Sequence, residues 1–454
     1  MVLTFLLLAS LADWTPAYWN SSDPKTLDLV AETPVNCLLL EQPQWSAAFA
    51  QQADARGVAT LGVIRPGSDP LDAARLALGA KLTGVVLEGD FDPTASRRVR
   101  ESLGESNAIV VELQPRASLR LTGADPIVGT YQGLWPGVQA QENGSVKAGP
   151  TGAPWIDTNE GFLRFVRAAT DASVWIGYRP PPKTVVPVTR YLQAIADAAL
   201  VGARWIVALD EDFSSRLLKG EPGALMAWRR MAVHLKYFEE HKDWRSFRPA
   251  GQLALVQDAD NGALLSGSIL DMISVKHTPV RPLPRRKLKE GALKGSKMTV
   301  NVDPGALSSE EKQVLLSFAR TGGTLYSGPP GWKFPPPQKD QVTLGNDDLQ
   351  KLNDIWRELQ SLIGRRNLGV RLFNVSSMLS NLLAAPDGSQ MILHLVNYSG
   401  YPVDSVTAHV LGSYKHALLY SPEAPPKELE VYPVEEGTGV DIPQVSVCAT
   451  LVLN

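Results

Sequence analysis

Acidic side chains directly follow four apolar segments in the first half of the chain. The segments cover residues 37–40, 85–87, 109–111 and 205–209, and each is continuously apolar instead of alternating. Continuous apolarity is typical of parallel strands that are buried on both faces. In a (β/α)8 barrel the carboxyl ends of such strands open on one face, where the active site lies. The pattern therefore predicts carboxylate chemistry at the mouth of a TIM-like barrel.

Two carboxyl groups at one mouth could cleave a glycosidic bond. One group protonates the leaving oxygen, and the other acts as the nucleophile or activates water. Asp210 and Glu211 are adjacent, so at least one of them should face the mouth. Gly89 would let the backbone turn sharply between two further acids. The candidate catalytic residues are Asp210, Glu211, Glu88, Asp90 and Glu112.

The same acids also have structural alternatives. Asp210 or Asp212 could cap the helix that follows them, and Asp92 could cap the helix after the 85–87 strand. Glu112 could pair with an arginine such as Arg116. The sequence leaves both interpretations open.

Aromatic and polar residues that follow predicted strands suit a sugar-binding cleft. Sugar rings pack their C–H faces on aromatic rings, while carboxylates, amides and guanidinium groups bind the hydroxyls. Asp157 and Asn159 could instead begin a helix at 160–169, and Glu41 could form a hydrogen bond across the barrel. The candidate substrate-binding residues are Glu41, Tyr131, Trp135, Trp155, Asp157, Asn159, Tyr178 and Arg179.

Composition argues against several other kinds of site. All six histidines lie at or after His234, so neither a Ser-His-Asp triad nor a histidine-rich metal site is expected in the barrel. The two cysteines, Cys37 and Cys448, are interpreted as buried thiols. We therefore expect no metal. No phosphate-binding glycine loop is present, so we expect no nucleotide cofactor. A net charge of -3 gives no support for a nucleic-acid partner.

The first twelve residues resemble a secretory signal. Residues 1–12 have an apolar core and small residues before a possible cleavage site, although a truncated first strand is the alternative. No later run is long enough to span a bilayer. The sequence therefore predicts a secreted or periplasmic protein.

The remaining pattern predicts three domains after the signal. A barrel is expected over 13–248, with seven strands between residues 37 and 209 and a further candidate strand at 253–257. A smaller α/β domain is expected over 249–345, with a helix from 308 to 321 that Ser308 caps. A linker helix and short alternating strands predict an antiparallel β-sandwich over 346–454.

Two segments carry a family resemblance. Residues 315–325 (LLSFARTGGTL) and 394–399 (HLVNYS) resemble multidomain glycoside hydrolases built from a barrel, an amidotransferase-like α/β domain and a β-sandwich, such as the family 42 β-galactosidases. The resemblance implies an Asn-Glu pair at the end of strand four and a glutamate nucleophile on strand seven. Counting strands from Glu41 places Glu112 on strand four and Asp210 on strand seven, but Val111 precedes Glu112 where the family has asparagine. The middle domain has no cysteine nucleophile, so it is expected to be a scaffold or a homo-oligomer contact.

Two functions from different classes remain. The first is an exported glycoside hydrolase that cleaves an oligo- or polysaccharide with Asp210 or Glu211 and one of the other candidate acids. The second is a catalytically inactive carbohydrate-binding protein on the same scaffold. Two carboxylates about 5–10 Å apart in one cavity would favour the enzyme. Acids engaged by arginines and helix caps would favour binding.

Overall fold

The computed structural model describes most of the chain. The described residues are 11–67, 69–104, 108–121, 125–135, 138–140, 146–148, 158–257, 270, 277–302, 305, 307–328, 346–364, 367–375 and 377–454. The predicted signal segment, apart from its last two residues, lies outside them. Within these ranges, no helix is long and apolar enough to cross a membrane.

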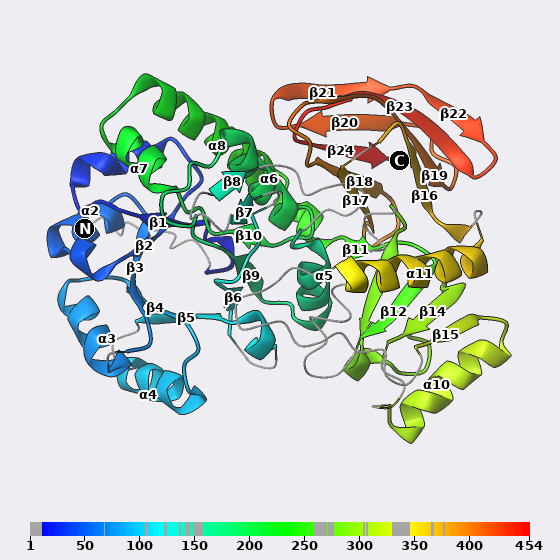
Figure 1. Ribbon diagram of the computed structural model, residues 1–454, viewed down its shortest axis with the longest axis horizontal. Helices are drawn as coiled ribbons and strands as arrows, with labels where there is room; N and C mark the ends of the chain where they lie inside the picture. The colour runs from blue at the N-terminus through cyan, green and yellow to red at the C-terminus, as the bar shows by residue number, and fades with distance from the viewer. Residues whose placement is uncertain are drawn as a thin grey trace, which may run out of the picture.

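Eight parallel strands form a nearly closed barrel in the amino-terminal half (Figure 1). The ring closes where the Tyr18 amide donates to the Val207 carbonyl (2.8 Å) and the Val207 amide donates to the Pro16 carbonyl (3.0 Å). The TIM-like barrel is therefore confirmed. Its strands, in order, are β1 (Pro16–Trp19), β2 (Cys37–Leu40), β3 (Ala59–Ile64), β4 (Gly84–Glu88), β5 (Ile109–Gln114), β6 (Ile127–Thr130), β9 (Ser173–Ile176) and β10 (Arg204–Trp205).

The first barrel strand corrects our strand count. β1 is only four residues long and begins with a proline, so it lacks the apolar run by which the other strands were recognised. The candidate strand at 253–257 belongs to a different sheet. Glu88 consequently ends the fourth strand, Glu112 lies within the fifth, and Asp210 follows the eighth. The match of Glu112 and Asp210 to strands four and seven was wrong.

Helices cover the outside of the barrel, which explains the continuously apolar strands. In β2, Cys37 and Leu39 belong to the cluster inside the barrel, whereas Leu38 and Leu40 pack toward the helices. Both cysteines are buried free thiols, as predicted. The helices are α1 (Leu27–Ala31), α2 (Ala47–Asp54), α3 (Pro70–Gly79), α4 (Pro93–Leu103), α5 (Glu160–Ala169), α6 (Val188–Ala199), α7 (Glu211–Leu218) and α8 (Pro222–Glu240). A short hairpin, β7 (Val138–Ala140) and β8 (Val146–Ala148), lies between β6 and α5.

A second, smaller α/β unit follows the barrel. Its four strands are all parallel, in the order β13 (Val280–Pro284), β12 (Leu253–Gln257), β14 (Met298–Asn301) and β15 (Thr324–Ser327). Helix α10 (Ser309–Arg320) begins with the predicted cap, because the Ser308 hydroxyl and the Glu311 carboxylate each accept the other residue's amide. Helix α11 (Asn346–Ile363) follows this unit in the sequence and precedes the strands of the carboxyl-terminal region. A likeness of this unit to amidotransferases stays a prediction.

The carboxyl-terminal region is built from two antiparallel sheets, as expected for a β-sandwich. One sheet has the order β11 (Arg248–Pro249), β17 (Met378–Ala384), β18 (Met391–Asn397), β24 (Cys448–Leu453), β20 (Ala417–Ser421) and β21 (Ala424–Leu429). The other has the order β16 (Val370–Phe373), β19 (Val403–Leu411), β23 (Gly437–Val445) and β22 (Val431–Val434). Residues from both sheets form one apolar core.

The barrel and the sandwich are joined through helix α6. The Gln193 amide donates to the Asn397 carbonyl (2.8 Å) and the Ser399 carbonyl (3.0 Å). The Tyr398 hydroxyl donates to Asp197 (2.5 Å). The segment that resembles glycoside hydrolase sandwiches therefore contacts the barrel directly.

Candidate functional site

Five side chains meet at the carboxyl ends of the barrel strands. Tyr18 lies on β1, Glu41 and Arg65 directly follow β2 and β3, Glu88 ends β4, and Arg179 lies beyond β9. Each occupies the alternating position that points into the barrel. Tyr18 belongs to the interior cluster itself, Leu39, Val63 and Val86 of that cluster lie two residues before Glu41, Arg65 and Glu88, and Trp175 lies four residues before Arg179. We call these five residues, Tyr18, Glu41, Arg65, Glu88 and Arg179, the mouth cluster.

Two guanidinium groups connect the two carboxylates of the mouth cluster. Arg65 holds Glu41 through two parallel hydrogen bonds of 2.8 Å each. The same guanidinium donates to Oε1 of Glu88 from Nε (3.0 Å) and Nη2 (2.9 Å). Arg179 donates to Glu41 and lies 3.8 Å from Oε2 of Glu88. Each carboxylate therefore faces both arginines.

Tyr18 completes the mouth cluster from the barrel interior. Its hydroxyl donates to Oε2 of Glu88 (2.6 Å), and the guanidinium of Arg179 lies 3.9 Å from the centre of its ring. Burial, and then the neighbouring charge of Glu88, raises the pKa of Tyr18 well above its usual value. Tyr18 therefore stays a neutral donor, and both oxygens of Glu88 accept hydrogen bonds.

Glu41 is ionised at neutral pH. Partial burial would raise the pKa of Glu41, but hydrogen bonds and charge from Arg65 and Arg179 outweigh it and lower that pKa. The two carboxylates and two guanidinium groups balance in formal charge. Such a group offers donors and acceptors to hydroxyls without strongly favouring a charged ligand.

The chain turns sharply just after Glu88. Gly89 has φ +142°, and a Cβ atom there would lie 2.5 Å from Cδ of Pro66. The turn that we predicted at Gly89 is present, and it leaves Asp90 exposed. Asp92 caps α4 through the Thr94 amide (2.7 Å), which was the structural alternative for this loop.

Asp210 caps helix α7. Oδ1 accepts the Phe213 amide (2.8 Å), and Oδ2 accepts the Tyr191 hydroxyl (2.8 Å) and the Val186 amide (3.0 Å). The side chain is buried, whereas Glu211 is exposed in the first turn of α7. Asp210 thus has the helix-capping role that the sequence left open as the structural alternative.

Glu112 points away from the barrel interior. Its neighbours Val111 and Leu113 belong to the interior cluster, so Glu112 faces outward. There it accepts from Arg100 (3.0 Å) and from Arg120, not from Arg116 as we had considered. An outward carboxylate between two arginines cannot share a substrate with the mouth cluster.

The predicted substrate-binding residues divide between mouth, rim and core. Glu41 and Arg179 are in the mouth cluster, Tyr178 is 42 % exposed, and Tyr131 is half-buried. Trp135 is buried: its Nε1 donates to the Tyr178 carbonyl (2.8 Å), and its ring contacts Tyr191 and Trp205 edge-on. Trp155 and Asp157 lie outside the described residues.

Asn159 is also a core residue. Its side chain accepts from Arg116 (2.5 Å) and the Leu134 amide (2.7 Å), and it donates to Asp197 (2.8 Å). It stands at the start of α5 without a side-chain cap bond. Its hydrogen-bonding groups are directed to the protein instead of a ligand.

The sequence interpretation missed Tyr18 and Arg65. Tyr18 was missed together with its strand. Arg65 directly follows an apolar strand in the inward-facing alternation, but Arg179 is the only arginine that we proposed from the sequence as a binding residue. Among the described residues, no three His, Cys, Asp or Glu side chains are grouped so that they could hold a metal ion.

Comparisons with known proteins point to the fold. No family model and no curated protein matches the sequence. The structure matches α-L-fucosidase isoenzyme 2 from Paenibacillus thiaminolyticus with a TM-score of 0.64 at 10% identity, covering 97% of this chain and 99% of that one. A rhamnosidase from Novosphingobium sp. PP1Y matches with a TM-score of 0.44 at 12% identity, over 90% of this chain and 39% of that one. A β-galactosidase from Marinomonas ef1 matches with a TM-score of 0.35 at 12% identity, over 89% and 66%.

The first of these matches shows that the chain shares the overall fold of a glycoside hydrolase. It covers both chains almost completely, so the likeness includes the arrangement of the domains as well as the barrel. Assignment to family 42 stays a prediction.

Proposed function

We propose that this protein binds a carbohydrate at the barrel mouth without cleaving it. The observation that carries the proposal is the sharing of Glu41 and Glu88 between Arg65 and Arg179. Glycoside hydrolysis needs a carboxyl group that holds a proton at the working pH and gives it to the leaving oxygen. In the mouth cluster, the effect of burial on Glu41 is outweighed by the two arginines, which lower its pKa, and both oxygens of Glu88 already accept hydrogen bonds from Tyr18 and Arg65.

Each buried candidate acid is already a hydrogen-bond acceptor. Glu88 accepts on both oxygens, from Tyr18 and Arg65. Asp210 accepts on both oxygens within the cap of α7. In both residues the two carboxyl oxygens are already engaged by donors of the protein, so neither oxygen is left for a substrate without a rearrangement. This leaves the exposed Asp90 and Glu211, which form no ion pair or side-chain hydrogen bond among the described residues.

The mouth cluster suits the recognition of sugar hydroxyls. Guanidinium groups present several donors in a fixed plane, and carboxylates accept from neighbouring hydroxyls. The buried Nε of Arg179 has no hydrogen-bond partner in the described structure, so the cluster retains a donor. Tyr178 on the rim offers an exposed ring for packing against a sugar face. Together with the signal-like residues 1–12, these features support a receptor for oligo- or polysaccharides outside the cytoplasm.

A glycoside hydrolase is the second candidate. It is favoured by one specific feature: Oε1 of Glu41 and Oε1 of Glu88 lie 2.8 Å and 2.9 Å from the same nitrogen, Nη2 of Arg65. The two carboxyl groups are therefore close together, as in retaining glycosidases, where the separation is about 5–5.5 Å. Catalysis would require the substrate to displace an arginine from one of them.

Calorimetric titration with a panel of neutral oligosaccharides tests the proposal. We expect at least one to bind the wild-type protein, and we expect Arg179→Met to weaken that binding at least tenfold, because it removes a guanidinium donor from the mouth cluster while Arg65 still holds Glu41. Arg75→Met is the matched control, since Arg75 is exposed on α3 and pairs only with Asp72.

Two results would overturn carbohydrate binding at the mouth. The first is that no oligosaccharide binds, and the second is that Arg179→Met binds as tightly as the Arg75→Met control. Release of reducing sugar that disappears in Glu88→Gln would instead favour the hydrolase.

A further inference from the structure

A basic pocket lies where the barrel, the second α/β unit and the sandwich meet. Its volume is about 190 Å³, and among the described residues it is lined by five cationic side chains but by no Asp or Glu. We call it the junction pocket. Its cations are Arg164, Arg167, Arg245, Arg248 and Lys287.

The cations of the junction pocket come from four elements. Arg164 and Arg167 lie on α5, and Arg245 lies in the short helix after α8. Arg248 is on β11, and Lys287 is in the turn after β13. Figure 1 shows β11 beside the end of α5, between the barrel and the sandwich. Three parts of the fold are thus needed to bring these charges together.

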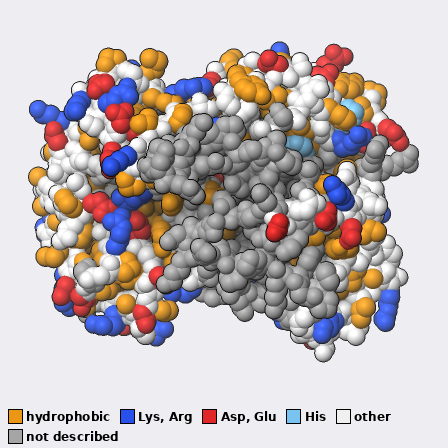
Figure 2. All heavy atoms as spheres, in the orientation of Figure 1, with side chains coloured by type: hydrophobic (Ala, Val, Ile, Leu, Met, Phe, Trp, Pro, Cys, Tyr) orange, Lys and Arg blue, Asp and Glu red, His pale blue; other side chains and the backbone are white. Residues whose placement is uncertain are grey.

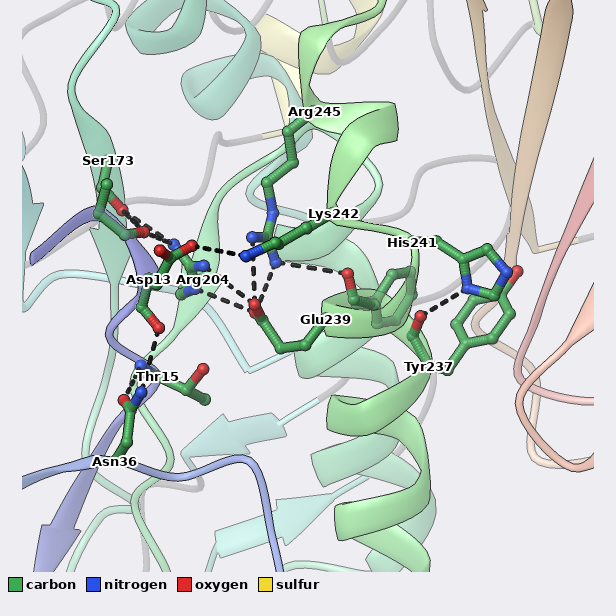
Figure 3. Close-up of polar contacts among 12 residues, drawn as sticks. Asp13, Thr15, Asn36, Ser173, Arg204, Tyr237, Glu239, His241, Lys242 and Arg245 are labelled. Atoms are coloured by element: carbon green, nitrogen blue, oxygen red, sulfur yellow. Dashed lines mark hydrogen bonds and ion pairs between the residues drawn. The ribbon is translucent and has the colours of Figure 1, made fainter. Parts of the chain in front are cut away.

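Two of the five cations have carboxylate partners. Arg164 pairs with Glu160 (2.8 Å) and donates to the Ser380 carbonyl (2.9 Å). Arg245 pairs with Glu239, which also holds Arg204, as Figure 3 shows. Glu239 is therefore shared between two arginines. Neither glutamate lines the pocket.

In the part of the chain that the structure describes, the other three cations form no ion pair with a carboxylate. Arg167 donates only to the carbonyls of Ala172 (3.1 Å) and Arg245 (3.5 Å). Lys287 donates to the Ala168 carbonyl (2.9 Å). Arg248 forms no hydrogen bond or ion pair among the described residues. Positive charge at the junction pocket therefore exceeds the negative charge in contact with it.

Buried polar groups in this pocket are not fully satisfied. Arg164 is only 5 % exposed, and its Nε has no hydrogen-bond partner. Burial lowers the pKa of Arg167; the charge of Asp171 acts against this effect, and Arg248, Arg245 and Arg204 add to it. Gathering like charges in a partly buried site is unfavourable unless an opposite charge is supplied.

The pocket walls and size limit what could supply that charge. Trp244, Phe247 and the segment 282–284 add apolar surface, and Asn381 adds an amide. The volume is below the roughly 300–1,000 Å³ of pockets for drug-sized ligands. A ligand of one ring fits these dimensions better than an oligosaccharide.

We propose that the junction pocket binds a monosaccharide-sized oxyanion, with a carboxylate or phosphate group held by Arg167, Arg248 and Lys287. The apolar walls would contact the ring. The site is separate from the mouth cluster and does not depend on the function proposed there. Because the ligand would contact all three parts of the fold, its binding should stabilise their arrangement.

Thermal unfolding and calorimetry at low salt test this proposal with three probes: glucuronate, glucose 6-phosphate and neutral glucose. We expect at least one of the two anions to raise Tm by several degrees and glucose to have no effect. The two anions distinguish a carboxylate site from a phosphate site. Arg179→Met should leave anion binding unchanged, because that residue lies in the mouth cluster.

The double variant Arg248→Gln with Lys287→Gln should weaken anion binding at least tenfold. Both side chains are exposed, so the variant is expected to fold, and its unliganded Tm reports this directly. Arg286→Gln is the control, since Arg286 is exposed next to Lys287 but does not line the pocket. The proposal is overturned if neither anion binds, if glucose binds equally well, or if the double variant binds as the control does.

Discussion

Neighbouring arginines decide what the acids of this barrel can do. Glu41 and Glu88 are at the mouth, but each faces the same two guanidinium groups. Asp210 caps a helix, and Glu112 accepts hydrogen bonds from Arg100 on the outside of the barrel. The chemistry available to a carboxylate at the end of a barrel strand thus depends on the groups that surround it.

Glu160 is a buried acid whose ionisation opposes folding. Its side chain is fully buried, one oxygen lacks a hydrogen-bond partner, and the other accepts from Arg164 (2.8 Å). Burial raises the pKa of Glu160 from 4.5 to about 7; Arg164 lowers it, and nearby Asp197 adds to the increase. The folded protein therefore binds more protons than the unfolded chain between these two pH values, and stability falls as pH rises through this window.

Glu160→Gln should remove this pH dependence. Relative to the wild type, the variant should gain stability between pH 4.5 and 7, by up to about 3 kcal/mol, and the gain should be constant above that window. Urea unfolding at a series of pH values measures it. Glu101→Gln is the control, because Glu101 is exposed on α4. An unchanged difference between wild type and Glu160→Gln across this range would contradict the account.

At the residue scale, the positions of side chains at the ends of predicted strands pointed to three members of the mouth cluster. Glu88, Glu41 and Arg179 were predicted from their positions after apolar strands, and the structure brings them together. The outward direction of Glu112 follows from its position between Val111 and Leu113, an alternation that we did not apply. The partners of each acid could not be predicted, because they come from strands distant in sequence.

Long apolar runs and helix stop signals made most elements predictable. α5 occupies the predicted range 160–169, and α10 begins with a capping serine, as its sequence predicts. β1 was not recognised, because a four-residue strand beginning with proline carries little pattern. Its pairing with both β2 and residue 207 is a long-range property of the closed barrel.

Helix α6 provides the element that couples the barrel to the sandwich. Gln193 is fully buried and its amide satisfies two carbonyls of the 394–399 segment. We expect Gln193→Ala to lower the free energy of unfolding by about 2–3 kcal/mol, because two buried carbonyls lose their donor and a small cavity forms. Chemical denaturation measures this change.

The matched control for this interface is Gln51→Ala. Gln51 is exposed on α2, so the same substitution should change stability by less than about 0.5 kcal/mol. If Gln193→Ala were no more destabilising than Gln51→Ala, the hydrogen bonds between α6 and the sandwich would not contribute to holding the two parts together.

At the scale of the whole molecule, the displayed face of the barrel half carries charges of both signs. Figure 2 shows acidic and basic side chains intermingled over the barrel half of the face that it displays. The net charge of -3 agrees with such mixing. The junction pocket differs, since cations from three parts of the fold meet there without an acid in its lining. Its existence could not be predicted, because it depends on how the domains are placed.

The architecture of a hydrolase does not by itself supply hydrolysis. The chain shares the fold of an α-L-fucosidase at 10% identity. Function depends on whether a proton donor faces the bound sugar. In the mouth cluster the acids are held by arginines, and this is the basis for proposing binding without cleavage.

Mass spectrometry of a bound oligosaccharide incubated in heavy-oxygen water tests this claim most directly. Hydrolysis adds one water oxygen to each new reducing end, so even slow cleavage leaves a labelled, shorter product. We predict that the oligosaccharide with the highest affinity, with its reducing end blocked as a methyl glycoside so that it cannot exchange oxygen with water, is recovered at full length and without label after prolonged incubation with the wild-type protein. Shorter, labelled products that are absent with Glu88→Gln would contradict the account and identify the mouth cluster as a catalytic site.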